Sequence, residues 1–141
     1  MNMVDFAASQ MQLHESRRLA YGGYNQLELV KYPVKIIADQ NIKAMPQAGW
    51  EKDGMYVTAV QIVNISGNSK RIKPAQFHGE WLSVVIEDDN LQPRNADNSS
   101  THVYLISEYP FYQALNRGRQ LSSVQPVLPD IQPNNRSGIS N

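Results

Sequence analysis

Three histidines are the side chains in this sequence best suited to acid–base or metal chemistry, but their spacing argues against both. His14, His78 and His102 are far apart, and none lies at metal-ligand spacing from another. His78 stands close to Gly79 and Trp81, where a turn histidine satisfied by backbone groups is favoured over a catalytic base. We therefore predict no metal site, and a hydrolase that uses His78 is the least favoured of three functional classes.

Other enzyme signatures are missing from the sequence. It has no Gly-x-Ser-x-Gly nucleophile motif and no Walker or dinucleotide-binding pattern. Glu87 and Asp88 are adjacent, so on a strand they would point to opposite faces and could not work as a carboxylate pair. The absence of cysteine excludes disulfides, thiolate metal sites and a cysteine nucleophile. The sequence predicts a protein that is not an enzyme and uses no cofactor.

The elements expected to position these residues are mostly strands. Residues 54–64 are rich in β-branched and aromatic side chains, and a turn cluster follows at 66–69. Residues 81–86 and 101–109 predict two more strands. Several strands separated by turns, without crossover helices, indicate a mainly β fold, an antiparallel β-sandwich with a short helix at each end.

The N-terminal part is expected to be helical before the sheet begins. Apolar residues at helical spacing predict a helix over 4–19 that ends at Tyr21-Gly22-Gly23. Residues 25–37 predict a strand at a sheet edge, because Pro33 cannot donate to a ladder. Residues 38–53 are interpreted as a loop that leads into the sheet.

The C-terminal part predicts one more helix. Pro110 suits a helix start, residues 111–117 give two turns, and Gly118 is interpreted as the stop. Beyond it the chain is poor in core residues and rich in proline, serine and asparagine, which is typical of disorder. The predicted organisation is an N-terminal helix or linker (1–22), a β-sandwich domain (23–118) and a disordered tail (119–141).

Size and charge narrow the classes of partner. The 141 residues fit one domain, and 13 basic residues balance 13 acidic ones. A chain with no net charge lacks the field that would attract nucleic acid. No apolar run reaches the roughly 20 residues of a membrane helix, and no signal peptide is visible at the start. These totals alone predict a cytoplasmic protein without a membrane-spanning segment.

Trp81 and Phe77 are candidate partner-binding residues. If the strand over 81–86 alternates regularly, Leu82, Val84 and Ile86 share an apolar face and Trp81 lies on the more exposed side. An exposed tryptophan beside Phe77 would be an anchor for a protein contact. A core role for both rings remains the alternative.

Lys70, Arg71 and Lys73 form a basic cluster in which charged and apolar residues alternate. Solvated strand ends are the simplest interpretation of such a run. The alternative is an exposed sheet edge that accepts a strand from a partner by β-augmentation.

The order of these motifs resembles a known family. The sequence is similar to the C-terminal part of TraK-like proteins, which are encoded by integrating conjugative elements and conjugative plasmids. The resemblance extends over about residues 4–117. It is carried by Phe6-Ala7-Ala8-Ser9-Gln10-Met11, Val57-Thr58-Ala59-Val60, Gly79-Glu80-Trp81, Thr101-His102-Val103-Tyr104-Leu105-Ile106 and Phe111-Tyr112-Gln113-Ala114-Leu115.

The resemblance implies a structural subunit of a type IV secretion system, with no catalytic role. Such subunits lie in the periplasm and form the outer-membrane core ring with copies of themselves, a lipoprotein and an envelope-spanning scaffold protein. Family members begin with a signal peptide and an N-terminal β-domain, and this chain looks like the portion that follows them. Export is therefore implied by the resemblance, and without cysteine no disulfide can tether a lipoprotein.

The second functional class is a small ligand-binding β-sandwich. In this alternative Trp81 and Tyr56 would stack against a glycan. Stereospecific glycan binding that is lost in Trp81→Ala would favour it over the structural subunit.

Overall fold

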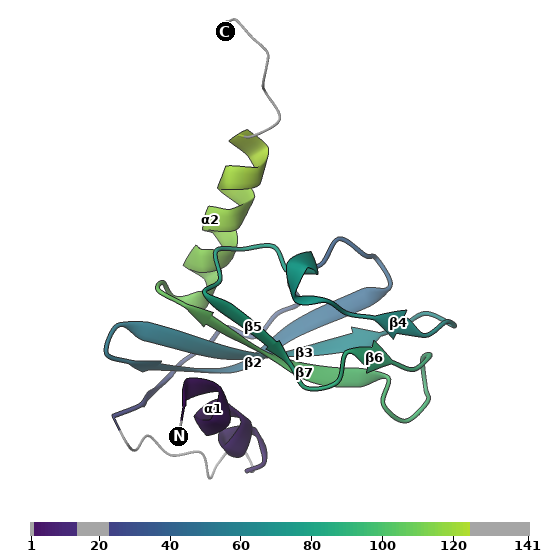
Figure 1. Ribbon diagram of the computed structural model, residues 1–141, viewed down its shortest axis with the longest axis horizontal. Helices are drawn as coiled ribbons and strands as arrows, with labels where there is room; N and C mark the ends of the chain where they lie inside the picture. The colour runs from purple at the N-terminus through teal and green to yellow at the C-terminus, as the bar shows by residue number, and fades with distance from the viewer. Residues whose placement is uncertain (1, 14–22, 125–141) are drawn as a thin grey trace, which may run out of the picture.

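The computed structural model describes residues 2–13 and 23–124 (Figure 1). Within them the fold is mainly β, as predicted, with a five-stranded antiparallel sheet and a two-stranded sheet. In spatial order the large sheet contains β1 (Asn25–Leu27), β2 (Ile42–Lys52), β3 (Met55–Asn64), β7 (Ser100–Ser107) and β5 (Ser83–Ile86). The small sheet pairs β4 (Lys70–Arg71) with β6 (Asn90–Leu91). The helices are α1 (Met3–Met11), the short 3-10 helix η2 (Pro74–Gln76) and α2 (Phe111–Val124).

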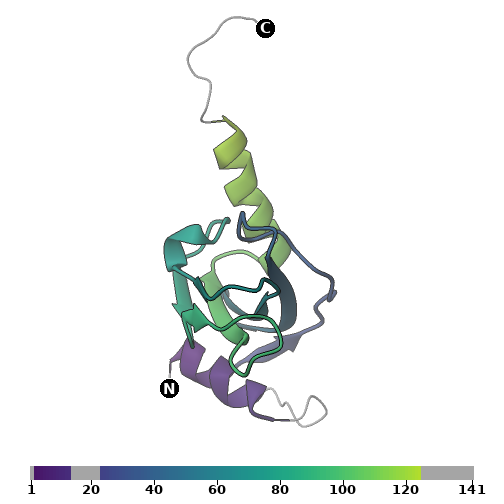
Figure 2. The same ribbon diagram turned by 90° about the vertical axis from the view of Figure 1, so that its right-hand side faces the viewer.

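One face of the large sheet packs against the small sheet and α2. Its core joins apolar residues of β2, β3 and β7 to Ile72, Leu91, Phe111 and Leu115. Leu91 belongs to β6 and Ile72 follows β4, so the small sheet forms a second layer over this face. The result is a sandwich-like arrangement, from which α2 rises away from the body (Figures 1 and 2).

The opposite face is covered by α1, which lies beneath the sheet in both views. Phe6 of α1 is 1% exposed, stacks on Tyr24 with ring centroids 3.9 Å apart, and meets Trp50 edge-on at 5.8 Å. Val57 and Tyr104 of the sheet complete this second core. Burial of a phenylalanine side chain contributes about 1.5–3 kcal/mol, so Phe6 is the main anchor of the helix.

The helix at the N-terminus is shorter than the sequence predicts. Asn2 caps it by accepting the Asp5 N–H at 2.7 Å, and α1 ends at Met11 with Gln12 as its C-cap. The prediction of a continuous helix to Leu19 is wrong at residues 12 and 13, and residues 14–22 lie outside the described residues. The apolar residues of the helix that contact the sheet run from Met3 to Met11, so α1 extends as far as its packing against the sheet.

The predicted loop over 38–53 is wrong, because most of it forms β2, the longest strand described. β2 and β3 make a hairpin through Asp53 and Gly54, whose φ values are 54° and 81°. Positive φ at both central residues is the signature of the tight hairpin turn that Asp-Gly favours. The sequence does not predict this strand because it contains Pro46, and proline is tolerated inside a sheet mainly at bulges.

The bulge lies at that proline. The register of β2 against β3 shifts between Pro46 and Ala48, so Gln47 is the extra residue. Ala44 packs into the core under α2, whereas Trp50 packs into the core over α1. Because side chains alternate faces along a strand, the extra residue is what moves the even-numbered positions from one face to the other.

The predicted edge strand over 25–37 is found in two short pieces. β1 pairs with the edge of β2 through Leu27 and Gly49, and Val34 makes an isolated bridge to Ala44. Between these pairings the chain leaves the sheet over residues 28–33, which we call the strap. The predicted strand over 54–64 is β3, that over 101–109 is β7, and that over 81–86 starts at Ser83.

α2 begins directly after Pro110, as predicted, but it does not stop at Gly118. The helix continues to Val124, so residues 119–124 belong to it, contrary to the expectation that the tail begins at residue 119. The remainder of the predicted tail, 125–141, lies outside the described residues. Neither α1 nor α2, the α-helices of the described segments, has the length and apolar character of a membrane span.

Candidate interaction surface

Several of the acid–base side chains that the structure describes are held by partners inside the fold. Among the described residues no three His, Asp or Glu side chains lie close enough together to hold a metal ion. Glu87 accepts the hydroxyl of Tyr104 at 2.7 Å, and its other oxygen lies 3.8 Å from His102 Nδ1. Burial, with the Glu87 contact added to it, raises the pKa of Tyr104. This side chain is therefore held neutral as a hydrogen-bond donor and is poorly suited to act as a base.

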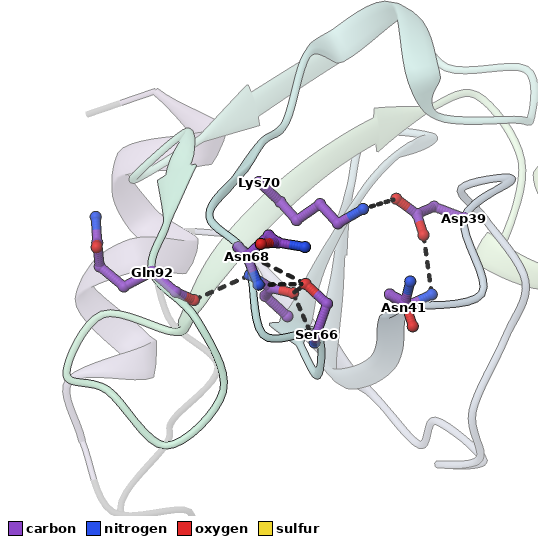
Figure 3. A network of polar contacts seen from close by, with 7 residues as sticks. Asp39, Asn41, Ser66, Asn68, Lys70 and Gln92 are labelled. Atoms are coloured by element: carbon purple, nitrogen blue, oxygen red, sulfur yellow. Dashed lines mark hydrogen bonds and ion pairs between the residues drawn. The ribbon is translucent and has the colours of Figure 1, made fainter.

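His78 lines a hollow of about 830 Å³ and shares its wall with Asp39. Asp39 is committed elsewhere, because its carboxylate accepts the Asn41 N–H at 2.9 Å and pairs with Lys70 Nζ at 3.2 Å (Figure 3). The Asn41 N–H is the main reason that the pKa of Asp39 lies below its usual value, with Lys70 adding to it against the effect of burial. The acidic residue that shares this hollow with His78 is therefore part of a structural ion pair.

A buried asparagine holds the loops around that ion pair. Asn64 is fully buried, and its amide donates to the carbonyls of Asn68 at 2.8 Å and Gln92 at 3.0 Å. Its side-chain oxygen accepts both the N–H and the hydroxyl of Ser66. Figure 3 shows this network next to the Lys70–Asp39 pair. The predicted turn over 66–69 is fixed by these bonds, which also place Lys70.

The three residues of the predicted basic cluster each make a different contact within the fold. Lys70 pairs with Asp39, and Arg71 lies 3.3 Å from Asp89. The Lys73 N–H donates to the side chain of Gln76 in η2. β4 spans two residues and pairs with β6, so it is shorter than the accepting edge that the sequence suggested.

The two predicted aromatic contact residues are used inside the fold. Phe77 is 6% exposed and belongs to the core under α2. Trp81 is half-buried: its ring stacks on Phe111 with centroids 5.6 Å apart, and its Nε1–H donates to the His78 carbonyl at 2.8 Å. The two side chains therefore pack against α2 and do not form the exposed pair that the sequence suggested.

The segment over 78–81 forms a clamp on the first two turns of α2. The Glu80 N–H donates to the Ala114 carbonyl at 2.9 Å, and the Glu80 carboxylate accepts from Arg117 Nε at 2.8 Å. Gly79 lies against Gly118, where a Cβ on Gly118 would come within 2.3 Å of the Gly79 Cα. The two glycines therefore allow the helix and the segment to cross at backbone distance.

The surface with the features of a contact site is the outer edge of β5. This strand is at the end of the sheet order, and β7 is its one partner among the described strands. The Glu87 N–H donates to the His102 carbonyl, so alternation along the ladder turns the backbone groups of Val84 and Ile86 toward the open side. Leu82 and Val85 are 55% and 38% exposed at this edge.

A second exposed apolar surface lies on the strap. Tyr32, 49% exposed, stacks on Tyr112 of α2 with ring centroids 5.1 Å apart and an interplanar angle of 10°. The Tyr112 hydroxyl donates to the carbonyl of Val30, whose side chain is 68% exposed. We call Tyr32 and Tyr112 the tyrosine pair. A hollow of about 620 Å³ between the strap and the bulge of β2 adjoins it at Val30.

Sequence reasoning missed both surfaces for identifiable reasons. Regular alternation placed Leu82 on one apolar face with Val84 and Ile86, but Gly79 adopts φ 133° and the strand starts at Ser83, so the alternation does not extend back to Leu82. Tyr32 was included in an expected strand. The available signal was Pro33, because proline cannot donate to a ladder and argues against a continuous strand.

A family model described as "Protein of unknown function (DUF3438)" matches residues 24–123. The chain belongs to this family. The DUF3438 match covers every strand of both sheets and nearly all of α2, and α1 lies outside it. A comparison with curated proteins finds none that matches the sequence.

Proposed function

We propose that this DUF3438 protein is a non-enzymatic structural subunit of a conjugative type IV secretion system. In this role it assembles into the core ring of the periplasm and outer membrane that transfers DNA. Its partners are further copies of itself, an outer-membrane lipoprotein and an envelope-spanning scaffold subunit. We infer the secretion system, the compartment and these partners from the resemblance to TraK-like proteins of integrating conjugative elements.

The observation that carries a structural role is the open edge of β5. A strand with outward-facing backbone groups and two exposed aliphatic side chains is a template on which another chain can add a strand. Main-chain hydrogen bonds along Val84 and Ile86 would supply affinity, and Leu82 and Val85 would supply side-chain contacts. The acidic residues that follow, Glu87 to Asp89, favour a partner strand with a basic end.

The glycan-binding alternative is weakened by the position of Trp81. A ring that stacks a sugar needs an open face, but this indole is stacked on Phe111 and its N–H is bonded to His78. Tyr56 belongs to β3 and is partly buried. The Trp81 face that packs on Phe111 and the Trp81 N–H are therefore not available to a sugar.

The proposal is tested by Leu82→Asp in the full chain, with Leu13→Asp as the matched control. Leu13 is 40% exposed just after α1, so the control makes the same chemical change away from β5. Each variant is assayed for co-purification with the lipoprotein and scaffold subunits of the same element, and for the frequency of conjugative transfer. We expect Leu82→Asp to lower both at least about tenfold, the loss typical of an interface anchor.

The control is expected to behave like the unmodified protein in both assays. Normal transfer and normal co-purification of the Leu82→Asp variant would contradict the role of this edge. A full chain that captures neither subunit, in an element whose transfer does not depend on it, would contradict the proposed function itself.

A further inference from the structure

We infer that the Pro126-Val127-Leu128-Pro129 segment of one copy binds the tyrosine pair of a neighbouring copy. This contact would link copies head to tail. The inference does not rest on the proposed role in secretion, because it uses a surface and a segment that the β5 edge does not involve.

The tyrosine pair has the form of a platform for proline. Tyr32 and Tyr112 present two stacked rings at the surface, and the bond from the Tyr112 hydroxyl to Val30 fixes the strap beside them. Phe111 supports Tyr112 from the core side with an edge-on contact at 4.9 Å. Grooves lined by aromatic rings are the surfaces on which Pro-x-x-Pro segments bind.

The chain itself contains a matching ligand. Pro126 and Pro129 are three residues apart. A polyproline II helix has three residues per turn, so both rings would project from one side, separated by about 9 Å along the axis. The two residues between them, Val127 and Leu128, are apolar. They suit the adjoining hollow, whose lining includes Leu27, Leu29 and Val30.

Geometry excludes the tyrosine pair of the same chain as the acceptor. α2 rises about 1.5 Å per residue, so Val124 lies about 18 Å beyond Tyr112 along the helix axis. Two residues extend the chain by about 7 Å at most, which leaves Pro126 about 11 Å or more from its own Tyr112. Pro129 could reach that level only fully stretched. The segment can therefore lie across the tyrosine pair of a second copy and not across its own.

This arrangement determines the symmetry of the assembly. The donor segment follows the tip of α2, whereas the acceptor surface surrounds its base, so the two halves of the contact are different surfaces. Such a heterologous contact generates a ring if the rotation between copies closes, and an open filament if it does not. Figures 1 and 2 show α2 projecting from the body, which places its tip where a neighbour can meet it.

The first test measures self-association of the full chain by sedimentation equilibrium. We expect association that weakens at least about tenfold in Tyr32→Ser and in the double variant Pro126→Ala/Pro129→Ala. Pro133→Ala, outside the Pro-x-x-Pro segment, and Leu82→Asp, at the β5 edge, are the matched controls and should associate normally. Circular dichroism and thermal unfolding establish that each variant is folded.

The second test uses the absence of cysteine in the natural chain. Val30→Cys and Val127→Cys variants, distinguished by a tag on one of them, are mixed and oxidised. We expect a mixed disulfide between the two chains, and a ladder of linked oligomers when both substitutions are placed in one chain. Asp97→Cys, in an exposed loop, replaces Val30→Cys in the control mixture and should give little product.

Three results would overturn the inference. They are a full chain that stays monomeric at its highest soluble concentration, association that Tyr32→Ser leaves unchanged, and cross-linking of Val127→Cys that is no faster to Val30→Cys than to Asp97→Cys. Loss of self-association in Tyr32→Ser together with normal capture of the lipoprotein would support this inference separately from the proposed function.

Discussion

Gly118 of α2 lies against the backbone of Gly79, and the two residues are separated by less space than one methyl group needs. A Cβ added at Gly118 would approach the Gly79 Cα to 2.3 Å and its N to 2.5 Å. A glycine inside a helix costs roughly 1 kcal/mol relative to alanine, so this glycine is retained against helix propensity. Its function is to let the segment over 78–81 bind the helix closely.

Gly118→Ala is therefore expected to destabilise the protein even though it improves helix propensity. The backbone of Gly79 cannot give way as a flexible side chain would, so overpacking should lower the free energy of unfolding by about 1–3 kcal/mol. Chemical denaturation followed by circular dichroism measures the change. Gly67→Ala is the control, because an added Cβ there has no atom within 4 Å. A more stable Gly118→Ala protein would contradict the close crossing.

Asn64→Asp is expected to be among the most destabilising single-atom changes available in the chain. It removes the amide that donates to Asn68 and Gln92 and turns a carboxylate oxygen toward their carbonyl groups. Leaving such buried acceptors unsatisfied should cost at least about 2 kcal/mol, measured by urea denaturation. Asn68→Asp is the matched control, since its exposed side chain makes none of these bonds and its backbone makes them instead. Equal effects of the two variants would rule out Asn64 as the centre of the network.

Asp39 gives the fold an acid-sensitive contact. Its pKa in the folded state is lowered from 3.8, mainly by the Asn41 N–H. The carboxylate therefore stabilises the folded state above the unfolded pKa of about 3.9, and this stabilisation is lost as the pH falls through the lower folded value. Asp39→Asn should reduce the free energy of unfolding at pH 7 by up to about 1 kcal/mol, because the pair with Lys70 is partly exposed.

The difference between Asp39→Asn and the unmodified protein should shrink as the pH is lowered from 7 to 3, and urea midpoints at each pH measure it. Asp97→Asn, in an exposed loop, is the control. A deficit that grows toward low pH would have the wrong sign for a carboxylate with a lowered pKa.

Deletion of Gln47 tests the bulge in β2. Without the extra residue, Pro46 and Ala48 would be consecutive and could still pair with Val60 and Ala59, so Ala44 and Trp50 would keep the faces on which they are now buried. We therefore expect the deletion variant to fold, with a change of less than about 2 kcal/mol in the free energy of unfolding, measured by urea denaturation. Deletion of Asn95 in the loop after β6 is the control, which should also be tolerated. A Gln47 deletion that fails to fold would show that β2 cannot pair with β3 without the bulge.

Local patterns predicted the parts of the fold whose side chains alternate without interruption. β3 and β7 were recognised because β-branched residues follow one another between turn signals. β2 was not, since Pro46 and Gly49 weaken the strand pattern, and the Asp53-Gly54 hairpin signal was divided between the expected loop over 38–53 and the expected strand over 54–64. A bulge that accommodates proline depends on pairing with β3, which local sequence does not encode.

The candidate surfaces were harder to predict because they depend on what the rest of the chain covers. Phe77 and Trp81 have the residue types of a contact site, but α2 packs over both, and its position follows from the crossing at Gly118. Gly118 itself was interpreted as a helix stop, since a glycine that ends a helix and one that allows close packing look alike in sequence. The exposure of Leu82 likewise follows from where β5 begins.

The switch of faces along β2 also governs how the two halves of the molecule respond to stress. A single continuous backbone supplies Ile42 to the layer beneath α2 and Trp50 to the layer above α1, with no hinge between them. Loosening either helix must therefore disturb the same strand, and the layers should melt together as one thermodynamic unit. A force applied to α2 would therefore also act on the opposite face of the sheet, where Phe6 is buried.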